Sequence, residues 1–451
     1  MDEKCYDSDV KNATFRAVST RHALAQVRKS LGDARVVLIN GPRQAGKTTL
    51  VRELLHPEVG GTFATLDDET TLAACLADPR TFLDRPRPVI IDEFQHAGDR
   101  LLRAVKALVD EDRQAGQFVL TGSTRFLTLP TISESLAGRV HIVDLWPYTQ
   151  GEALGLGPGA DRFLPHVFGA TPMWDSLQGV RLPTRREYLE QLCRGGYPEA
   201  VAIAPAARPA FFRNYVRTIT QRDVPEISRI RRVDELPRLL RLLAASTAQE
   251  VKDTALAERL SLDRRTLGAN YLPLLQTVYL SLELPAWSRN LVTRVARQPK
   301  QYLVDTGLAT HLLGVSHDRL AEPTAPATGA LVETFAANEL VRQASRFADT
   351  LGARLYHYRA HGGTEVDVVA ETDDGRVVGI EVKAAASVDS GAFSHLAAVR
   401  DRVDKVDDME FVRGIVLYTG NAVHSFGDRL LALPLCALWM PLEQMTATSI
   451  P

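Results

Sequence analysis

Short apolar runs alternate with helical patterns near the start of the chain. The runs RVVLIN (35–40), PVIIDEF (88–94) and QFVLTGS (117–123) are apolar and rich in branched residues, as buried strands are. Between the first two, the apolar positions of KTTLVRELL (47–55) have the spacing of one helix face. Strands that alternate with helices predict an α/β fold with a parallel sheet.

The pattern changes twice further along. Glycine and proline are frequent from 151 to 180, which predicts a lid-like insertion. Helical patterns dominate from 185 to 313, and EPTAPATGA (322–330) is typical of a boundary. A long helical pattern then precedes short strands, a helix and two last strands, GIVLYTG and CALWM. We expect four parts: 1–30, 31–205, 206–322 and 323–451.

The composition is that of a globular protein, with 45% hydrophobic and 24% charged residues among 451. A net charge of −2 gives no overall basic field, although a local basic patch stays open. The four cysteines are too far apart for a zinc site or a disulfide framework, which favours a reducing compartment. The polar N-terminus is no signal peptide, and the longest apolar run (430–442) is too short for a bilayer. We expect a cytoplasmic protein without membrane contact.

The segment GPRQAGKTT follows the first predicted strand and opens a helix. It matches G-x-x-x-x-G-K-[ST], in which the lysine reaches the β- and γ-phosphates and the threonine hydroxyl binds Mg²⁺. Backbone N–H groups of such a loop cradle phosphates, and glycines let the backbone approach closely. ATP and Mg²⁺ are therefore the expected cofactors. The expected nucleotide-binding residues are Gly41, Pro42, Arg43, Gln44, Ala45, Gly46, Lys47, Thr48 and Thr49.

Two carboxylates end the second predicted strand, where charges after an apolar run are otherwise costly. We expect Asp92 to hold Mg²⁺, directly or through water, together with Thr48. Glu93 is expected to orient and deprotonate the attacking water. Ser123, which with Thr121 ends the third strand, is a candidate for contact with the γ-phosphate, and an ordinary turn residue is the alternative.

Phosphoryl transfer also favours a positive charge on the γ-phosphate. Arg139, in SESLAGRVH, is the candidate, with Arg43 and Arg125 as rivals and a surface arginine as the alternative. An arginine donated by a neighbouring subunit would require an oligomer, so a homo-oligomer stays open.

Several segments resemble one known family. INGPRQAGKTTLVREL, IIDEFQ, LTGST and SLAGRV are similar to prokaryotic AAA-type P-loop ATPases that carry a C-terminal domain of unknown function. GGYPEA, YVRTITQRDV and QYLVDTGLATHLL look like the same family, so the resemblance runs from about residue 20 to about residue 385. The segment PKQYLVD is close to the usual family sequence but not identical. The resemblance implies ATP binding and hydrolysis without naming a cellular role.

The segment TALAERLSLDRRTLGANYLPLLQTVYLSLEL (254–284) predicts helix, turn, helix and an extended run. The family resemblance suggests a winged-helix-like module here, and such a helix can enter a DNA major groove. A helical packing module with solvated arginines is the alternative, so DNA, RNA and a partner protein are all candidate partners. The nearby basic residues are Arg259, Arg264, Arg265, Arg289, Arg294 and Arg297.

Charges interrupt two apolar runs in the last part. Glu381 and Lys383, in GIEVK, share one strand face because side chains at i and i+2 point the same way. Asp367 lies in the preceding apolar run, and the DDG link that ends at Gly375 decides whether it joins them. A three-residue loop with a left-handed Gly375 places Asp367 opposite Glu381, whereas a two-residue loop places it on the other face. We predict the three-residue loop, or another loop of the same parity.

An aspartate followed by Glu-x-Lys on the next strand looks like the PD-(D/E)xK nuclease core. The resemblance implies that Asp367 and Glu381 bind Mg²⁺ and that Lys383 activates water or stabilises developing charge. Glu333, in the preceding helical pattern, matches a third ligand. A structural ion pair between Glu381 and Lys383 is one alternative, and a fold that grips DNA without cutting it is another.

The sequence thus predicts a P-loop NTPase parallel sheet (31–205), a helical winged-helix-like module (206–322) and an α/β restriction-endonuclease-like domain (323–451). Mg²⁺-dependent ATP hydrolysis would be coupled to a C-terminal domain that acts on or grips nucleic acid. An ATP-driven switch or scaffold that binds a partner protein, with no nuclease activity, is the alternative.

Overall fold

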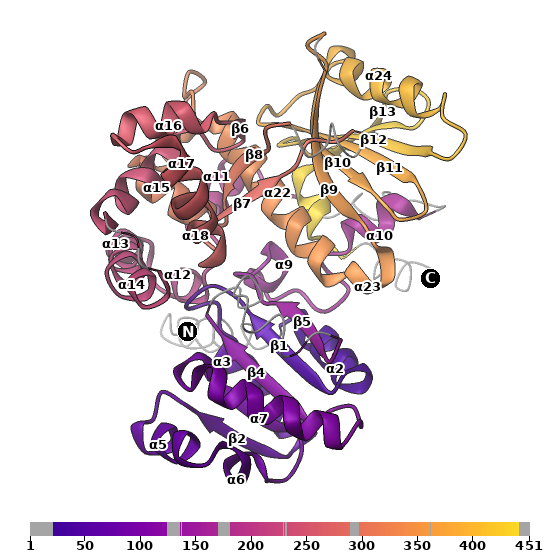
Figure 1. Ribbon diagram of the computed structural model, residues 1–451. Coiled ribbons are helices and arrows are strands. Elements are labelled where there is room, and N and C mark those ends of the chain that lie inside the picture. Colours follow the sequence, from indigo (N-terminus) through magenta and orange to yellow (C-terminus); the bar gives the residue numbers. More distant parts are fainter. Residues whose placement is uncertain are drawn as a thin grey trace, which may run out of the picture. The chain divides into compact units, whose positions relative to one another are not determined.

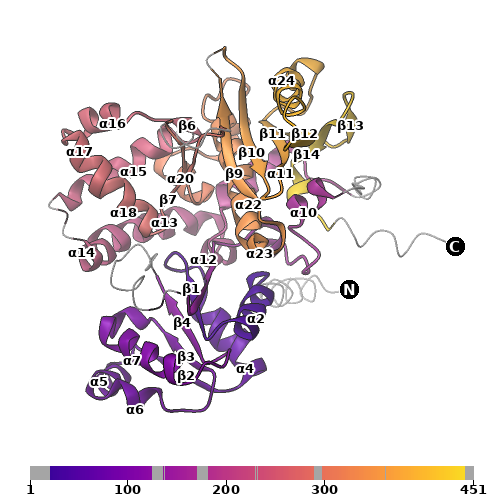
Figure 2. The ribbon, with the colours of Figure 1, turned by 45° about the vertical axis from the view of Figure 1, so that its right-hand side comes forward.

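The computed structural model describes residues 21–123, 136, 138–169, 181–228, 230, 232–288, 297–360 and 362–441. The chain forms two compact units. Unit 1 runs to Tyr148 and also contains Tyr197–Glu199 and Leu275–Leu280; the rest of the chain is unit 2. Figures 1 and 2 show the elements of both units from two sides.

Unit 1 is built on a parallel five-stranded sheet with the order β2-β3-β4-β1-β5 (Figure 1). The three apolar runs singled out in the sequence form β1, β3 and β4, so the predicted parallel α/β sheet is confirmed. The strands are β1 (Val36–Asn40), β2 (Thr62–Thr65), β3 (Val89–Asp92), β4 (Phe118–Gly122) and β5 (Val140–Asp144).

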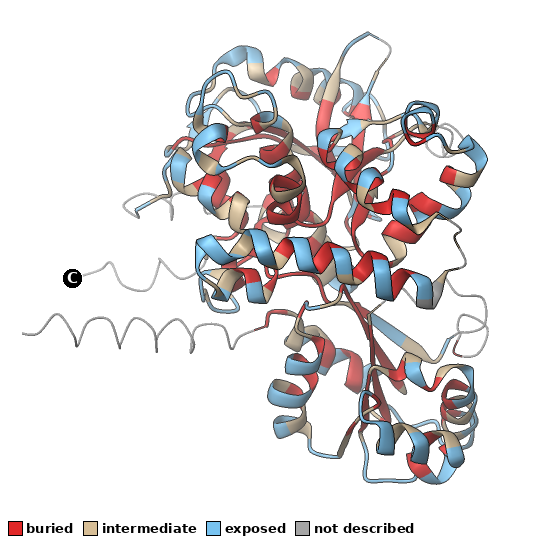
Figure 3. Ribbon diagram, turned by 90° about the vertical axis from the view of Figure 1, so that its left-hand side faces the viewer, coloured by how far each residue is buried: buried red, intermediate tan, exposed pale blue. Residues whose placement is uncertain are grey.

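Alternation along the strands divides the core of unit 1 into two layers. Leu38 belongs to the layer that includes α7 (Gly98–Glu111), and its neighbour Ile39 to the layer that includes α2 (Ala23–Asp33). Buried strands between helices with exposed outer faces are visible in Figure 3. The remaining helices are α3 (Lys47–Thr49), continued by a π-helical stretch (Leu50–Leu55), α4 (His56–Val59), α5 (Glu69–Ala77) and α6 (Pro79–Leu83).

Helix α2 lies across the predicted boundary between segments 1–30 and 31–205 and packs against β1. Val27 of α2 is fully buried in the same cluster as Val37 and Ile39 of β1. The core of the ATPase sheet therefore includes residues before 31. Residues 1–20 lie outside the described part of the chain.

The compact units also differ from the predicted boundary at residue 205. The segment after β5, which the sequence assigns to the ATPase domain, lies mostly in unit 2. Its backbone is bonded to one helix there: Gln150 N donates to Glu339 and Leu164 N donates to Gln343. These contacts are 189 and 179 residues apart in the sequence, so local patterns cannot reveal them. The helices of the segment are α9 (Gln150–Ala153), α10 (Phe163–Phe168) and α11 (Arg185–Arg194).

The middle of unit 2 is helical, with one small antiparallel sheet of order β6-β8-β7. The predicted helix, turn and helix are present, because Asp263 caps the second helix by accepting from Thr266 N at 3.0 Å. Two helices of this part, α12 (Pro198–Ala202) and α18 (Leu272–Thr277), overlap the short stretches assigned to unit 1. The other elements are α13 (Arg208–Thr218), α14 (Val224–Ile227), α15 (Leu236–Ala245), β6 (Gln249–Glu250), α16 (Asp253–Leu260), α17 (Arg264–Thr266), β7 (Ser281–Leu284), β8 (Lys300–Leu303), α20 (Thr306–Leu313) and α21 (His317–Ala321).

The last part of unit 2 contains a mixed six-stranded sheet of order β13-β14-β12-β11-β10-β9. The buried face of α24 (Leu396, Val399 and Val403) packs in one cluster with residues of β10, β11 and β12. The elements are α22 (Thr328–Arg346), α23 (Ala348–Leu351), β9 (Arg354–Arg359), β10 (Glu365–Glu371), β11 (Arg376–Lys383), α24 (Ser394–Val403), β12 (Glu410–Tyr418), β13 (His424–Ser425) and β14 (Leu430–Pro434).

One strand prediction in this sheet is wrong. The last long strand is β14, and CALWM follows it as a short 3-10 turn, Leu435–Leu438, and two further residues. Pro434 ends β14, and Cys436 N bonds to the hydroxyl of Tyr188 instead of to a neighbouring strand. Within the described ranges, no helix has both the length and the apolar composition needed to cross a bilayer.

Candidate functional site

Backbone conformation and close packing explain the two glycines of the phosphate loop motif. Gly46, with φ of 89°, takes a conformation that costs other residues about 1–2 kcal/mol. A Cβ atom on Gly41 would lie 2.2 Å from the carbonyl oxygen of Leu145. Both glycines of the motif are therefore required by the backbone itself.

Lys47 is buried at the start of α3, with 4% of its surface exposed. Its Nζ donates to the carbonyl oxygens of Gly41 and Pro42, at 3.0 Å each. These bonds offset the cost of burying the ammonium and hold its charge within the loop. The lysine is thus placed where the sequence motif expects phosphate.

Arg21, which sequence reasoning missed, fixes the other side of the loop. Its Nη1 donates to Ala45 O at 2.9 Å and its Nη2 to Trp146 O at 2.8 Å. The guanidinium also lies over the ring of Tyr148, 4.8 Å from the centroid. Arg21 therefore ties the loop to the chain that follows β5. The sequence around Arg21 contains no local pattern that predicts this contact.

Asp92 is held on both carboxylate oxygens at the carboxyl end of β3. Thr48 Oγ1 donates to Asp92 Oδ2 at 2.9 Å, and Thr121 Oγ1 donates to Asp92 Oδ1 at 2.5 Å. The same Thr121 oxygen accepts from Glu93 N at 3.2 Å. The structure thus brings together Lys47, Thr48, Asp92 and Glu93, as the sequence predicts.

Glu93 stands in a strained backbone conformation, with φ of 55° and ψ of 46°. Non-glycine residues in this region cost about 1–3 kcal/mol and are concentrated at functional sites. The side-chain amide of Gln95, which the sequence interpretation did not include, donates to the Glu93 carboxylate. Gln95 therefore orients the predicted base.

Two further candidates lie at opposite ends of the sheet. Ser123 follows Gly122, which pairs with Asn40 just before the phosphate loop. Arg139 precedes β5: its carbonyl accepts from the N–H of Val36 at the start of β1, and its Nε lies 2.5 Å from Asp110 Oδ1. The length of β1 separates Arg139 from the phosphate loop of its own chain, so the structure does not bring these two together. The rival Arg125 lies outside the described residues.

The oxygen donors beside the loop fit Mg²⁺. This ion prefers hard oxygen ligands in octahedral geometry and is usually bound by one or two carboxylates together with substrate phosphates. The Thr48 hydroxyl and the Asp92 carboxylate lie within 2.9 Å of each other, and no cationic side chain in the described ranges pairs with Asp92. The site therefore suits a metal ion that arrives with phosphate.

In unit 2, the β10–β11 hairpin has the predicted three-residue loop. Thr372 N donates to Arg376 O at 3.0 Å, and Gly375 is left-handed, with φ of 83°. The antiparallel register that continues from this turn pairs Val368 with Ile380, and Asp367 and Glu381 are the next residues on the two strands. Their side chains are hydrogen-bonded to each other. The prediction that these two carboxyl groups share a face of the sheet is confirmed.

The surroundings of Asp367 and Glu381 move the pKa values of these two carboxyl groups in opposite directions. Burial, followed by the neighbouring Asp367 carboxylate, raises the pKa of Glu381 to about 9. Burial opposes ionisation of Asp367, but Lys300, the hydrogen bond with Glu381 and the N–H of Val382, 2.9 Å away, together lower the pKa of Asp367. At neutral pH Glu381 is therefore the acid and Asp367 the carboxylate.

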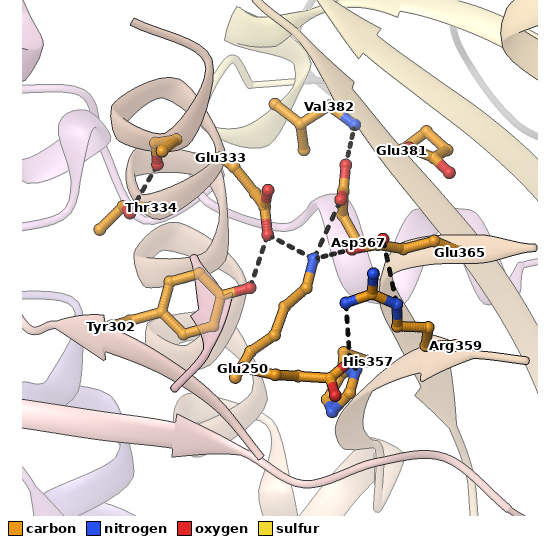
Figure 4. A network of polar contacts seen from close by, with 12 residues as sticks. Glu250, Tyr302, Glu333, Thr334, His357, Arg359, Glu365, Asp367, Glu381 and Val382 are labelled. Atoms are coloured by element: carbon orange, nitrogen blue, oxygen red, sulfur yellow. Dashed lines mark hydrogen bonds and ion pairs between the residues drawn. The ribbon is translucent and has the colours of Figure 1, made fainter. Parts of the chain in front are cut away.

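Glu333 of α22 faces Asp367, as the sequence predicts, but a lysine lies between them. Lys300, the first residue of β8, places Nζ 2.9 Å from Glu333 Oε1, 3.0 Å from Glu365 Oε1 and 3.2 Å from Asp367 Oδ1. Figure 4 shows these three carboxylates directed toward one point. The hydroxyl of Tyr302 donates to the same Glu333 oxygen at 2.7 Å. We call Lys300, Glu333, Glu365 and Asp367 the lysine cluster.

Sequence reasoning missed Lys300, Tyr302 and Glu365. The signal was available, because Lys300 and Tyr302 alternate on one strand face just as Glu381 and Lys383 do. The predicted domain boundary at residue 322 separated Lys300, in the middle module, from its carboxylate partners beyond that boundary. The pairing was therefore not considered.

The lysine cluster does not fit a divalent cation. An ammonium already contacts oxygens of Glu333 and Asp367, and the other Asp367 oxygen accepts from Val382 N. Glu381 is protonated at neutral pH and its Oε2 lies 3.4 Å from Lys383 Nζ. In the positions that the side chains of the described ranges take, with Lys300 in place, no group of three or more His, Cys, Asp and Glu could hold a metal ion. The predicted metal ligands are assembled, but around a lysine.

Three family models match the chain. Residues 33–154 match an AAA domain, residues 185–319 a domain of unknown function (DUF8612), and residues 328–438 another (DUF4143). With the geometry of the loop, the first match defines an AAA-type P-loop ATPase domain, and this supports ATP binding and hydrolysis. The function of the C-terminal domain is not given by its match.

The chain belongs to the same family as two mycobacterial proteins, the uncharacterised protein Rv2008c of Mycobacterium tuberculosis and the uncharacterised protein Mb2031c of Mycobacterium bovis. Each is 30% identical over 422 residues, which cover 92% of this chain and 84% of the relative. The AAA-type resemblance is confirmed by the AAA domain match of residues 33–154.

Solved structures resemble the chain more distantly. A Walker-type ATPase of Pyrococcus abyssi is 14% identical and covers 65% of this chain and 95% of its own, with a TM-score of 0.40. The RuvB Holliday junction branch migration motor of Thermotoga maritima is 18% identical and covers 61% and 89%, with a TM-score of 0.25. At these scores neither adds to the assignment.

Proposed function

We propose that this protein is a Mg²⁺-dependent ATPase whose nucleotide state controls what unit 2 binds. The observation that carries the proposal is the assembly of Lys47, Thr48, Asp92 and Glu93 at one edge of the parallel sheet. In such a site Lys47 would place its charge on the β- and γ-phosphates. Thr48 and Asp92 would supply oxygen ligands to Mg²⁺, which neutralises phosphate charge when bound.

Glu93 is the base in this proposal. Its carboxylate is oriented by Gln95 and its backbone N–H is fixed by Thr121. A carboxylate that borders the phosphates can accept the proton of the attacking water. The attacking oxygen then bonds to the γ-phosphorus. At the same time, the bond between the γ-phosphorus and the oxygen that bridges it to the β-phosphate breaks, and ADP leaves with that oxygen.

The experiment compares two variants with distinct outcomes. Lys47→Ala should lose both ATP binding and turnover, whereas Glu93→Gln should bind ATP and turn it over at least 100-fold more slowly. Filter binding of labelled ATP and a phosphate-release assay measure the two steps. Turnover that persists in Lys47→Ala would remove the proposal, and full turnover in Glu93→Gln would remove the role of Glu93.

Arg139 is assigned to a neighbouring subunit. It lies directly before β5 and far from its own loop, so it would reach a γ-phosphate only across an interface. Asp110→Asn breaks the same ion pair and is the matched control. We expect turnover to fall in Arg139→Ala but not in Asp110→Asn, and mixing Arg139→Ala with Lys47→Ala should restore part of it. Equal effects of the two single variants would contradict a role in trans.

Nucleic acid is the partner that a surface of unit 2 favours. Arg213, Arg217 and Arg241 line a hollow of about 480 Å³ together with His311. None of the three arginines has an ion-pair partner in the described ranges, and burial and two of them lower the pKa of His311. Unpaired arginines around a hollow suit phosphate groups. The helix–turn–helix with its small sheet also supports the winged-helix-like interpretation.

Binding of labelled duplex DNA at several salt concentrations tests this partner. Replacing the three arginines by alanine should weaken binding and reduce the slope of log K against log salt by about 2–3. Arg80, which is paired with Glu111, provides a control arginine. Unchanged DNA binding would leave a switch or scaffold for a partner protein as the function of unit 2.

A further inference from the structure

The lysine cluster has the number and direction of contacts that a bound cation needs. An ammonium group has three N–H donors and no acceptor. Lys300 Nζ lies between 2.9 and 3.2 Å from one oxygen of each of three carboxylates. The contacts with Glu333 and Asp367 are hydrogen bonds, and the contact with Glu365 is an ion pair. Three ionisable acceptors therefore surround the ammonium.

Burial makes this arrangement costly to change. The Lys300 side chain is 2% exposed, and the side chains of Glu333 and Asp367 are 13% and 12% exposed. Three carboxylates within 3.2 Å of the ammonium favour the charged form of the lysine. Lys300 stays charged, and removing it would leave like charges buried side by side.

The backbone also fixes the position of the ammonium. Lys300 pairs with Leu284 on β7 and with Glu250 on β6, so it lies on the central strand of its sheet. Tyr302, two residues along the same strand, bonds to the same oxygen of Glu333. The lysine therefore lies on the small sheet of unit 2, whereas the carboxylates lie on α22 and on β10 of the six-stranded sheet.

We propose that Lys300 is the resident cation of this cluster and excludes divalent metal ions from it. The C-terminal sheet would then carry a metal site that its own chain keeps closed, and whose ligands would be Glu333, Glu365 and Asp367. This goes beyond the proposed ATPase function and does not depend on it. A divalent cation enters only where the Lys300 ammonium leaves, because two cations cannot share these oxygens.

Mn²⁺ binding without nucleotide tests the proposal. Free Mn²⁺ is measured by electron paramagnetic resonance in a full-length Asp92→Asn background, which removes the oxygen site of unit 1. The parent should bind no Mn²⁺ through Asp367. Lys300→Met should bind one Mn²⁺ at least tenfold more tightly than the parent, and adding Asp367→Asn should abolish this binding.

Lys383→Met is the matched control. Lys383 is a second lysine of the same region, but it is 43% exposed and contacts Glu381. Its removal should create no Mn²⁺ site. Lys300→Gln keeps a buried hydrogen-bond donor and replaces Lys300→Met if that variant fails to fold.

Three results would overturn the proposal. The first is Mn²⁺ binding in the parent that Asp367→Asn abolishes. The second is a folded Lys300→Met or Lys300→Gln variant that binds no Mn²⁺. The third is equal Mn²⁺ binding in the Lys300 and Lys383 variants. None of these results bears on Lys47 or Glu93, so failure here leaves the ATPase proposal intact.

Discussion

The hydroxyl of Thr48 lies 2.9 Å from Oδ2 of Asp92, which joins the phosphate loop to the end of β3. The two residues are 44 positions apart in the sequence. Their contact exists because β1 and β3 flank β4 in one parallel sheet, whose carboxyl ends lie at one edge. The metal-binding half of the proposed ATP site would therefore depend on how accurately Asp92 is held.

Thr121→Val should show this dependence. Valine has the shape of threonine but leaves Oδ1 of Asp92 and N–H of Glu93 without the hydroxyl, which costs about 1–3 kcal/mol for a buried group. We expect kcat to fall roughly tenfold to a hundredfold, since each 1.4 kcal/mol is a factor of ten. Thr121→Ser, which keeps the hydroxyl, should retain most activity. Equal kcat for the two variants would contradict the role of the hydroxyl.

Arg21→Lys should raise the KM for ATP more than it lowers kcat. The single ammonium group of a lysine cannot replace the planar guanidinium of Arg21, which donates to Ala45 O and Trp146 O at the same time. The loop would lose its connection through Arg21 to the chain that follows β5, and nucleotide binding would have to restore the order of the loop. Arg28→Lys, on the exposed face of α2, is the control. Steady-state kinetics that leave KM unchanged would show that the loop does not need Arg21.

Stability should fall between pH 7 and pH 9 because of Glu381. Its pKa of about 9 in the folded protein is above the ordinary value of 4.5, so the folded state holds a proton that the unfolded state releases. The sign is therefore a loss of stability as pH rises, at most about 1.4 kcal/mol per pH unit for one proton. Glu333 and Glu339, with pKa values raised to about 7, lose most of their protons by about pH 8, so Glu381 dominates the upper part of this window.

Glu381→Gln isolates that contribution. The amide is neutral at every pH, so the melting temperature of unit 2 should depend less on pH between 7 and 9 than in the wild type. Calorimetry at fixed salt concentration measures the melting temperature at each pH. An unchanged pH dependence would mean that Glu381 is already ionised at neutral pH.

Gly375→Ala should disturb the register that unites Asp367 and Glu381. Alanine at φ of 83° is strained, and its Cβ would lie 2.4 Å from the carbonyl oxygen of Asp408. We expect a loss of about 2 kcal/mol or more in the free energy of unfolding, because strain and a backbone clash add. Gly329→Ala in α22, where nothing lies within 4 Å of the new Cβ, should be neutral or stabilising. Denaturant unfolding of both variants makes the comparison.

Local chemistry in the sequence determined much of this protein. The spacing from Gly41 to Thr48, the carboxylates after an apolar strand and the alternation of Glu381 with Lys383 each follow from backbone geometry over a few residues. The parity of the DDG loop even fixed which residue faces Glu381, because a hairpin register depends on its loop length alone. Nucleotide chemistry could be predicted for the same reason, since one contiguous loop carries most of it.

Contacts across long sequence distances were decided only by the tertiary structure. Arg21 meets Ala45 and Trp146 through the arrangement of α2 beside β1 and β5, and no local pattern encodes that arrangement. Lys300 meets Asp367 across 67 positions and an expected domain boundary. A charge in a strand signals only that some partner must exist, because burial demands compensation. Which partner it finds, a metal ion or a lysine, depends on how distant strands and helices pack around it.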